Sequence, residues 1–329
     1  MSQNDNRTIV DKFFEDMYLV IALIMSVFHI AVFTIYPIKS GVLYAIHLLF
    51  GLSLIFLSSG MKNKKTRILD LLFIILSFVI SIYIIRDYDA FAMRIQVFPN
   101  NMDVIMGAIA IILVLEATRR TAGWGLTIIA IISIIYAFSG AYLPGVLRHR
   151  GYDFKRVITT IFSEQGIYGT ALGVSATNVF LFILFAAFLG ASGADRVFQD
   201  LAIALAGNKR GGPAKIAVIS SAFFGSISGS AVANVVSTGA FTIPLMRDQG
   251  YEKKFAGAVE AVASTGGQIM PPIMGAAAFI LSDSTGTPYT KVCLAALIPA
   301  LMYYFTLFIM VDIESIKNSI VGLDDEDIP

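Results

Sequence analysis

Long uncharged, apolar runs alternate with short clusters of charged residues along most of the chain. The hydrocarbon core of a bilayer is about 30 Å thick, and a helix needs roughly 20 apolar residues to cross it. Helices are predicted because an open, lipid-exposed sheet would leave backbone groups without hydrogen-bond partners. The pattern therefore predicts seven spans, at residues 18–35, 41–60, 71–85, 102–115, 121–140, 172–191 and 292–311.

Composition agrees with a membrane protein and excludes several other classes. Of the 329 residues, 57% are hydrophobic and 14% are charged, whereas a soluble domain is about 25% charged. The formal net charge of +1 provides no basic excess for binding nucleic acid. A single cysteine excludes an intrachain disulfide and a thiolate metal cluster. The sequence also lacks a phosphate-cradling loop and a paired His/Glu zinc motif, so no ATPase or zinc enzyme is predicted.

Basic residues predict the orientation of the spans. With the N-terminus in the cytoplasm, more of the Lys and Arg side chains fall on the cytoplasmic side, as is usual in membrane proteins. This orientation places residues 153–164 outside, where they are predicted to form an amphipathic helix on the membrane surface. The first span follows an acidic, polar segment, so no cleaved signal peptide is predicted.

The pattern changes between residues 211 and 283. Residues 216–246 carry no charge, and this stretch is too long for one span and too short for two. Its middle, GSISGSA at 225–231, is too small and polar to face lipid, and basic residues flank both ends. Irregular backbone at this depth is tolerated only inside protein or along a water-filled cavity. Residues 213–246 are therefore predicted to form a re-entrant helical hairpin, with a single tilted helix as the alternative.

The next uncharged stretch, interrupted by Glu260, predicts a broken helix at residues 255–282. Its middle reads STGGQIMPP at 264–272, with two glycines before two prolines. Glycine weakens a helix, and proline lacks a donor and clashes with the preceding turn. A plain proline kink is the alternative, but the pattern favours several unwound residues. Unwound carbonyls can coordinate Na⁺, and freed helix N-termini can face an anionic substrate.

These motifs resemble those of a known transporter family. GGPAK at 211–215, FFGSISGSAVAN at 223–234 and GGQIMPPIMGAAAF at 266–279 resemble the large membrane subunit of tripartite ATP-independent periplasmic (TRAP) transporters. The four preceding spans are similar to the small membrane subunit fused at the N-terminus, as in the TAXI-type branch. The resemblance implies an elevator-type transporter in the bacterial inner membrane. It would import organic acids or amino acids with Na⁺, receiving them from an extracytoplasmic solute-binding protein.

The resemblance also implies which residues bind the ion and the substrate. They lie at the hairpin tip and at the helix break, and comprise Ser226, Ser228, Gly229, Ser230, Asn234, Ser264, Thr265, Gly266, Gly267 and Pro271. It implies no catalytic residue, no cofactor and no metal other than Na⁺.

The same resemblance divides the chain into regions. They are a small-subunit-like four-helix region at 1–117, scaffold and linker helices at 118–210, the first half of a transport domain at 211–312, and a polar, acidic tail at 313–329. The half transport domain consists of the hairpin at 213–246, the broken helix at 255–282 and a helix at 291–311. Transporters of this kind have two inverted halves, so the expectation is a fragment or split protein that needs a second chain.

Four side chains outside these motifs carry separate predictions. His29 and His47 lie inside early spans and are predicted to hydrogen-bond between helices rather than bind metal. Glu116, beside two arginines, is predicted to be a solvated helix end. Glu260 has two readings. An acid inside the membrane is a functional candidate, but an interfacial position near two lysines is favoured slightly.

The sequence as a whole predicts an all-α polytopic membrane protein with seven or eight spans, one re-entrant hairpin and one broken helix, equivalent to half of an inverted-repeat elevator transporter. The predicted function is that of a membrane permease component in a Na⁺-coupled, binding-protein-dependent symporter, and not an enzyme. Coupling to H⁺ stays open. One alternative is a truncated, inactive or assembly-only subunit. An integral-membrane enzyme is less favoured, because the acids, histidines and cysteine are scattered.

Overall fold

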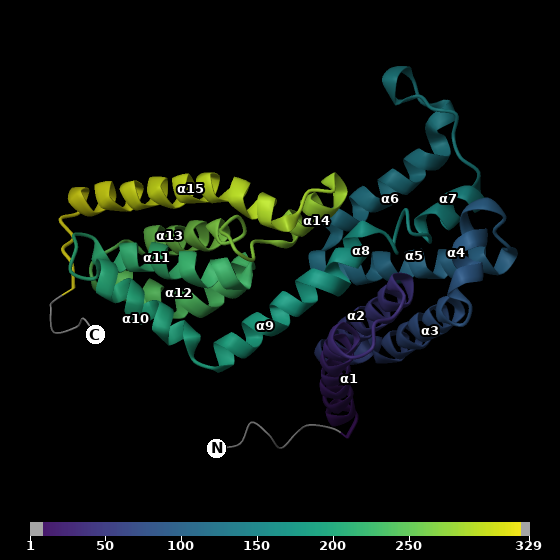
Figure 1. Cartoon of the computed structure of the whole chain (residues 1–329), viewed down its shortest axis with the longest axis horizontal. Helices are drawn as coiled ribbons and strands as arrows, with labels where there is room; N and C mark the ends of the chain where they lie inside the picture. Colours follow the sequence, from purple (N-terminus) through teal and green to yellow (C-terminus); the bar gives the residue numbers. More distant parts are fainter. Residues whose placement is uncertain (1–8, 324–329) are drawn as a thin grey trace. The chain divides into compact units, whose positions relative to one another are not determined.

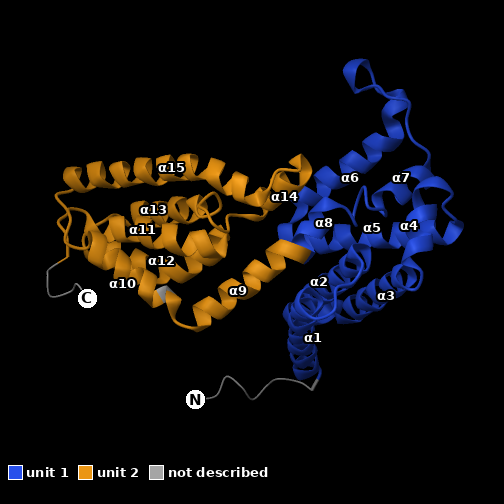
Figure 2. Cartoon of the chain, in the orientation of Figure 1, with its two compact units in different colours: residues 1–176 blue, residues 177–329 orange. Residues whose placement is uncertain are grey.

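The computed structural model describes residues 9–323, apart from the side chains of Ile9 and Asp195. It divides into two compact units, residues 1–176 and 177–329, and each is described by itself (Figure 2). Every regular element in the described part is a helix, which confirms the all-α prediction (Figure 1). The regions that the family resemblance implies end at residues 117, 210 and 312, and none of these boundaries coincides with the division after residue 176. Those regions therefore stay a prediction.

Seven stretches of helix in the described residues are long and apolar enough to cross a membrane, which confirms the seven predicted spans. The fifth span begins after its predicted first residue, whereas each of the other six begins before it, and the last continues to Lys317, inside the predicted tail. Residues 324–329 of that tail lie outside the described part. The spans are α1 (Ile9–Thr34), α2 (Ser40–Lys62), α3 (Arg67–Ile85), α5 (Asn101–Ala122), α6 (Trp124–Ser139), α8 (Thr170–Val174) continued by a π-helical turn (Ser175–Val179) and α9 (Phe180–Ala191), and α15 (Tyr289–Lys317).

The first unit packs around α2, which contacts α1, α3 and α5. Its core includes Phe56, Ile84 and Leu113, all of which are buried. Two shorter helices, α4 (Tyr88–Val97) and α7 (Phe154–Ile161), complete the unit. The helix predicted within residues 153–164 is therefore present as α7. Its apolar side is buried against α5, so protein rather than lipid covers that side.

A chain of polar side chains joins three elements of the first unit. His29 Nε2 of α1 lies 2.9 Å from His47 Nδ1 of α2. His47 Nε2 lies 3.0 Å from Ser175 Oγ in the π-helical turn. Both rings are buried. The two histidines therefore bond between helices, as predicted.

The prediction of a solvated helix end at Glu116 is wrong. Glu116 accepts hydrogen bonds from Arg119 and from Arg120, the second at 2.6 Å. The Arg120 side chain is only 8% exposed, and it also pairs with Asp70 of α3, which is completely buried. Asp70 lies fifty positions before Arg120 in the chain. Because Arg120 contacts both Asp70 and Glu116, the surroundings of Glu116 depend on how α3 and α5 pack.

The second unit is built on three mutually packed helices, α11 (Gly212–Ser228), α12 (Ala231–Asp248) and α13 (Lys253–Gly266). Helix α10 (Ala194–Ala206) packs on α11, while α15 packs along α11, α13 and α14 (Ala276–Thr285). Ala214, Ala217, Val218 and Met246 are buried between these helices. The small side chains at the start of α11 allow this close packing.

Candidate functional site

Helices α11 and α12 form a tight hairpin, in the region where the sequence predicts one. Gly229 ends α11 in the left-handed conformation, with φ 61°, and its N–H donates to the Gly225 carbonyl. Ser230 begins α12, and its hydroxyl accepts a hydrogen bond from the Ala233 N–H. Pro213 lies in the first turn of α11, where proline costs no hydrogen bond. The turn therefore consists of two residues, each suited to its position.

The broken helix is also present as two helices with an irregular connection. Helix α13 ends at Gly266 and α14 begins at Ala276. The Pro271–Pro272 peptide bond between them is cis, and Met274 has a positive φ of 59°. These residues cannot continue a helix, which agrees with the predicted unwound segment at the Gly-Gly and Pro-Pro pairs.

The hairpin tip and the helix break touch each other. The Ile273 N–H donates to the Ser226 carbonyl at 3.0 Å. A methyl group on Gly229 would overlap the carbonyl oxygen of Met274. Farther from the tip, a Cβ added to Gly225 would lie 2.5 Å from Gly267 Cα. Two pairs of backbone segments therefore approach so closely that only glycine fits at these positions.

Three of the predicted site residues line one cavity of about 470 Å³. Ser228, Gly229 and Ser230 come from the hairpin tip. Gln268 and Met274, which are not among the predicted site residues, come from the break. The first residues of α14 and the cap of α12 both lie at this cavity, so the N-termini of two helices line it.

Asn234 and Gly267 lie close together, and neither lines this cavity. Asn234 is completely buried, and its amide donates to the Ser221 carbonyl at 2.8 Å. A Cβ on Gly225 would lie 2.9 Å from the same amide nitrogen. Asn234 thus fills the space beside the close contact between Gly225 and Gly267, and it holds the two hairpin arms together.

The other predicted residues have different surroundings. The Ser226 hydroxyl donates to the Phe223 carbonyl in its own helix at 2.7 Å. Thr265 is exposed and donates to the Ala261 carbonyl, while Gly266 packs against the rings of Tyr303 and Tyr304. Pro271 lies in the break, and Ser264 bonds to Glu260. Their proposed roles at the ion and substrate site stay a prediction.

The favoured prediction for Glu260, an interfacial position near two lysines, is wrong. Its carboxylate is completely buried between α11, α12 and α13. Hydroxyl groups from all three helices reach it, and none of the side chains that hydrogen-bond to it is basic. The donors are Ser221 of α11, Thr238 and Thr242 of α12, and Ser264 of α13. The spacing of Thr238 with Thr242 and of Glu260 with Ser264, both i and i+4, is the sequence signal that could have revealed the cluster.

Helix α15 binds the broken helix through side-chain donors. Tyr303 donates to the Val262 carbonyl at 2.8 Å, and Tyr304 to the Ala263 carbonyl at 3.0 Å. Tyr289 donates to the carbonyl of Ile273, and the Cys293 thiol lies 3.4 Å from that of Pro272. Four carbonyls in and before the break therefore already accept a hydrogen bond from α15.

An ion pair fixes the opposite end of the second unit. Lys215, a buried residue of α11, donates to Asp312 of α15 at 2.5 Å, and Arg210 pairs with the same carboxylate at 2.7 Å. Tyr251 and Ser315 share a buried hydrogen bond of 2.6 Å nearby. Burial raises the pKa of the Tyr251 hydroxyl above its usual value, although the bond to Ser315 opposes this change. Arg210 and Lys215 are thus paired with Asp312 at the end of the unit away from the hairpin tip.

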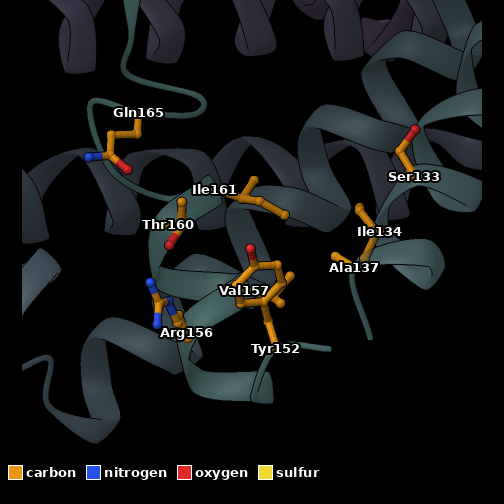
Figure 3. Close-up of a pocket in the computed structure, with 9 residues that line it drawn as sticks. All are labelled: Ser133, Ile134, Ala137, Tyr152, Arg156, Val157, Thr160, Ile161 and Gln165. Carbon is orange, nitrogen blue, oxygen red and sulfur yellow. The ribbon is translucent and has the colours of Figure 1, made fainter. Parts of the chain in front are cut away.

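A second cavity, of about 490 Å³, lies in the first unit (Figure 3). Ser133, Ile134 and Ala137 of α6 form one wall, and residues of α7 form the other. The Arg156 guanidinium lies 5.3 Å from the centre of the Tyr152 ring, a cation–π distance. None of the predicted site residues lines this cavity.

All of the second half of the chain and part of the first match a known protein family. Residues 109–329 match the family described as "Tripartite ATP-independent periplasmic transporter, DctM component". The chain is similar to the isethionate TRAP transporter permease protein DctMQ of Oleidesulfovibrio alaskensis, with 40% identity over 91 residues, covering 28% of the chain and 14% of that relative.

Two large permease proteins are similar over longer stretches. The C4-dicarboxylate TRAP transporter large permease protein DctM of Pseudomonas aeruginosa is 31% identical over 158 residues, which cover 46% of the chain and 36% of that relative. The 2,3-diketo-L-gulonate TRAP transporter large permease protein YiaN of Escherichia coli is 32% identical over 146 residues, covering 44% and 34%. The chain thus spans little more than a third of the length of either large permease.

Proposed function

The chain belongs to the DctM component family of tripartite ATP-independent periplasmic (TRAP) transporters, and from this premise we propose that it forms part of the pathway of a Na⁺-coupled importer of small organic acids. It is a membrane component of a transporter and not an enzyme. The proposal adds the coupling ion, the substrate class and the dependence on an extracytoplasmic solute-binding protein.

The observation that carries the proposal is the cavity between the hairpin tip and the helix break. The N-terminal ends of α12 and α14 both lie at this cavity, at Ser230 and Ala276. A helix N-terminus carries a partial positive charge and unpaired N–H groups, so it favours an anionic group. The adjacent irregular backbone offers carbonyl oxygens, which suit a hard cation such as Na⁺. An anion and a cation can therefore bind side by side.

The names of the relatives support the substrate class. One is described as a permease for isethionate, one for C4-dicarboxylates and one for 2,3-diketo-L-gulonate. All three compounds carry a sulfonate or carboxylate group, so each is an organic anion. We propose the same broad class for this chain, without selecting one compound.

The proposal also assigns partners and location. The chain would lie in the bacterial inner membrane with its N-terminus in the cytoplasm. A solute-binding protein would deliver the substrate from outside, and a further chain would supply the second half of the transport site. The pairing of two inverted halves around a midplane site is the usual architecture of such transporters.

Uptake of a radiolabelled organic acid into proteoliposomes tests the proposal. The complete assembly, with its solute-binding protein, should accumulate substrate when an inward Na⁺ gradient is applied, and should not do so with choline in place of Na⁺. Accumulation that is unchanged without Na⁺ would contradict the coupling ion. Accumulation that is unchanged without the binding protein would contradict the delivery step.

A substitution at the hairpin tip tests the site. Ser230→Phe places a ring in the cavity and removes the cap of α12, so uptake should be lost while the variant still inserts into the membrane. Ser192→Phe is the control, because Ser192 is an exposed residue that follows α9 and does not line the cavity. Normal uptake by Ser230→Phe would contradict the site assignment. Loss of uptake in both variants would favour a role in assembly alone.

A further inference from the structure

Two cavities of the first unit are adjacent, and their walls differ in character. One is the cavity between α6 and α7 that Figure 3 shows. The other has a volume of about 660 Å³. Arg156, Thr160 and Gln165 line both cavities, and in Figure 3 they lie on the side opposite the α6 residues. The second cavity also has polar side chains of its own: Gln96, Asp153, Lys155 and Thr159.

The wall that α6 contributes to the first cavity is apolar in effect. Ile134 and Ala137 carry no polar side-chain group, and the Ser133 hydroxyl donates to a carbonyl of its own helix at 2.9 Å. Val157 and Ile161 of α7 complete the apolar surface. The α6 residues lie in the second half of that helix, so this cavity is close to one end of a membrane span.

The basic side chains at the second cavity have no acidic partner. Lys155 and Arg156 are exposed, and no carboxylate in the described part of the chain forms an ion pair with either. Asp153 lines the same cavity, where it caps α7 and accepts a hydrogen bond from the Lys155 N–H at 3.1 Å. Glu164 accepts one from Tyr88. Two positive charges and one negative charge line this cavity, so it favours an anion.

An aromatic ring, rather than an acid, holds Arg156. Its guanidinium carbon lies 5.3 Å from the centre of the Tyr152 ring, and that of Arg150 lies 5.7 Å from the same centre. The Tyr152 N–H donates to the Ala137 carbonyl of α6 at 3.0 Å, which fixes the ring at the cavity. A cation–π contact uses no N–H group. The Arg156 donors and the Thr160 hydroxyl therefore stay available to a ligand, since neither side chain hydrogen-bonds elsewhere in the described residues.

A phospholipid explains both cavities, whereas a soluble anion explains only one. Free phosphate would use the polar cavity and leave the apolar one without a role. The end of a membrane span is the depth at which a lipid carries phosphate beside acyl chains. Arginine binds phosphate through paired N–H groups, and basic pockets between membrane helices attract anionic headgroups. The exposed rings of Tyr152 and Phe154 also suit the headgroup boundary.

We propose that the first unit binds an anionic phospholipid, with its phosphate at Arg156 and Lys155 and one acyl chain in the cavity between α6 and α7. The chain would pack against Ile134 on one side and Val157 on the other, so the lipid joins α7 to the end of the span. This site lies in a different unit from the proposed transport site, and lipid binding does not depend on transport.

Native mass spectrometry of the purified full-length chain in detergent tests the phosphate contact, with phosphatidylglycerol as the probe. R156Q should lower the affinity about 10- to 100-fold, as expected for the loss of hydrogen bonds to a charged group. R148Q is the matched control, because it removes one exposed positive charge nearby that lines neither cavity. R148Q should bind as wild type does. Equal affinities in the two variants would overturn the proposal.

A second pair of variants tests the acyl-chain cavity. S133F places a ring in this cavity, whereas S139F changes a serine of the same helix that makes the same kind of backbone bond but does not line it. S133F should lower the affinity for phosphatidylglycerol about tenfold or more, since displacing two buried CH₂ groups is enough for this. Equal binding by S133F and S139F, both folded by circular dichroism, would overturn the chain position. If S133F does not fold, the arginine pair decides alone.

Two further ligands separate the alternatives. Phosphatidylethanolamine, which has no net charge, should bind about fivefold more weakly, and equal affinity would overturn the preference for an anionic lipid. Glycerol 1-phosphate, which has no acyl chain, should not displace phosphatidylglycerol. Displacement at equal concentration would identify a site for soluble anions instead. Unchanged lipid binding by R156Q, together with weaker binding of the solute-binding protein, would identify a protein-docking surface and overturn the proposal.

Discussion

The contact between the hairpin tip and the helix break can be tested with a matched pair of glycine substitutions. Gly229 and Gly286 both end a helix in the left-handed conformation, with φ of 61° and 63°. They differ in their surroundings. A Cβ on Gly229 would overlap the Met274 carbonyl oxygen and lie 2.9 Å from its carbon, whereas a Cβ on Gly286 would meet nothing within 4 Å.

The expected magnitudes follow from this difference. Alanine in the left-handed region costs about 1–2 kcal/mol, and this cost applies to both variants. The smaller entropy loss of alanine on folding returns about 0.4–1 kcal/mol, again in both. Only G229A must also displace a backbone carbonyl in a packed interior, for which overpacking costs of about 1–3 kcal/mol are typical. G229A should therefore be about 1–3 kcal/mol less stable than G286A.

The assay is thermal unfolding of the purified chain in detergent, with the same scan rate for each variant. A difference of 1–3 kcal/mol corresponds to a decrease of about 2–12 °C in Tm for a unit of this size. G229A should also lose Na⁺-driven uptake in the complete assembly, while G286A keeps it. Equal Tm values for the two variants would refute the close contact between the tip and the break.

Two further predictions concern the first unit. D70N removes a carboxylate that pairs with the buried Arg120, so it should lower the free energy of unfolding by about 3 kcal/mol. The control D89N, at an exposed ion pair, should lower it by less than about 1 kcal/mol. Similar Tm values for the two variants would contradict the buried pairing of Asp70 with Arg120. H29F removes the bond from His29 Nε2 to His47 Nδ1 and should cost about 1–3 kcal/mol by thermal unfolding. Unchanged stability in H29F would show that the bond between the two rings contributes nothing.

Hydropathy alone predicted the spans, because lipid imposes the same requirement on every crossing helix. The hairpin and the break were also predictable, because the glycines and prolines in them act through their own backbones. Gly229 adopts the left-handed conformation that a tight turn needs, and Pro271 cannot continue a helix. Local chemistry of this kind is visible in the sequence itself.

The side-chain partners were less predictable, because they come from distant positions. Glu260 bonds to Ser221, which lies 39 positions earlier, and to Thr238, 22 positions earlier. Nothing near Glu260 in the sequence indicates which helix will cover it, and the two nearby lysines suggested an interface. Glu116 was misjudged for the same reason, since Asp70 reaches its arginine partner only after α3 and α5 pack.

Helix α15 contacts several backbone carbonyls in and just before the helix break. Its tyrosines and its cysteine already donate to carbonyls at Val262, Ala263, Pro272 and Ile273. The Met274 carbonyl lies against Gly229 of the hairpin tip instead. Substitutions in α15 and at the hairpin tip would therefore disturb different carbonyls of the break.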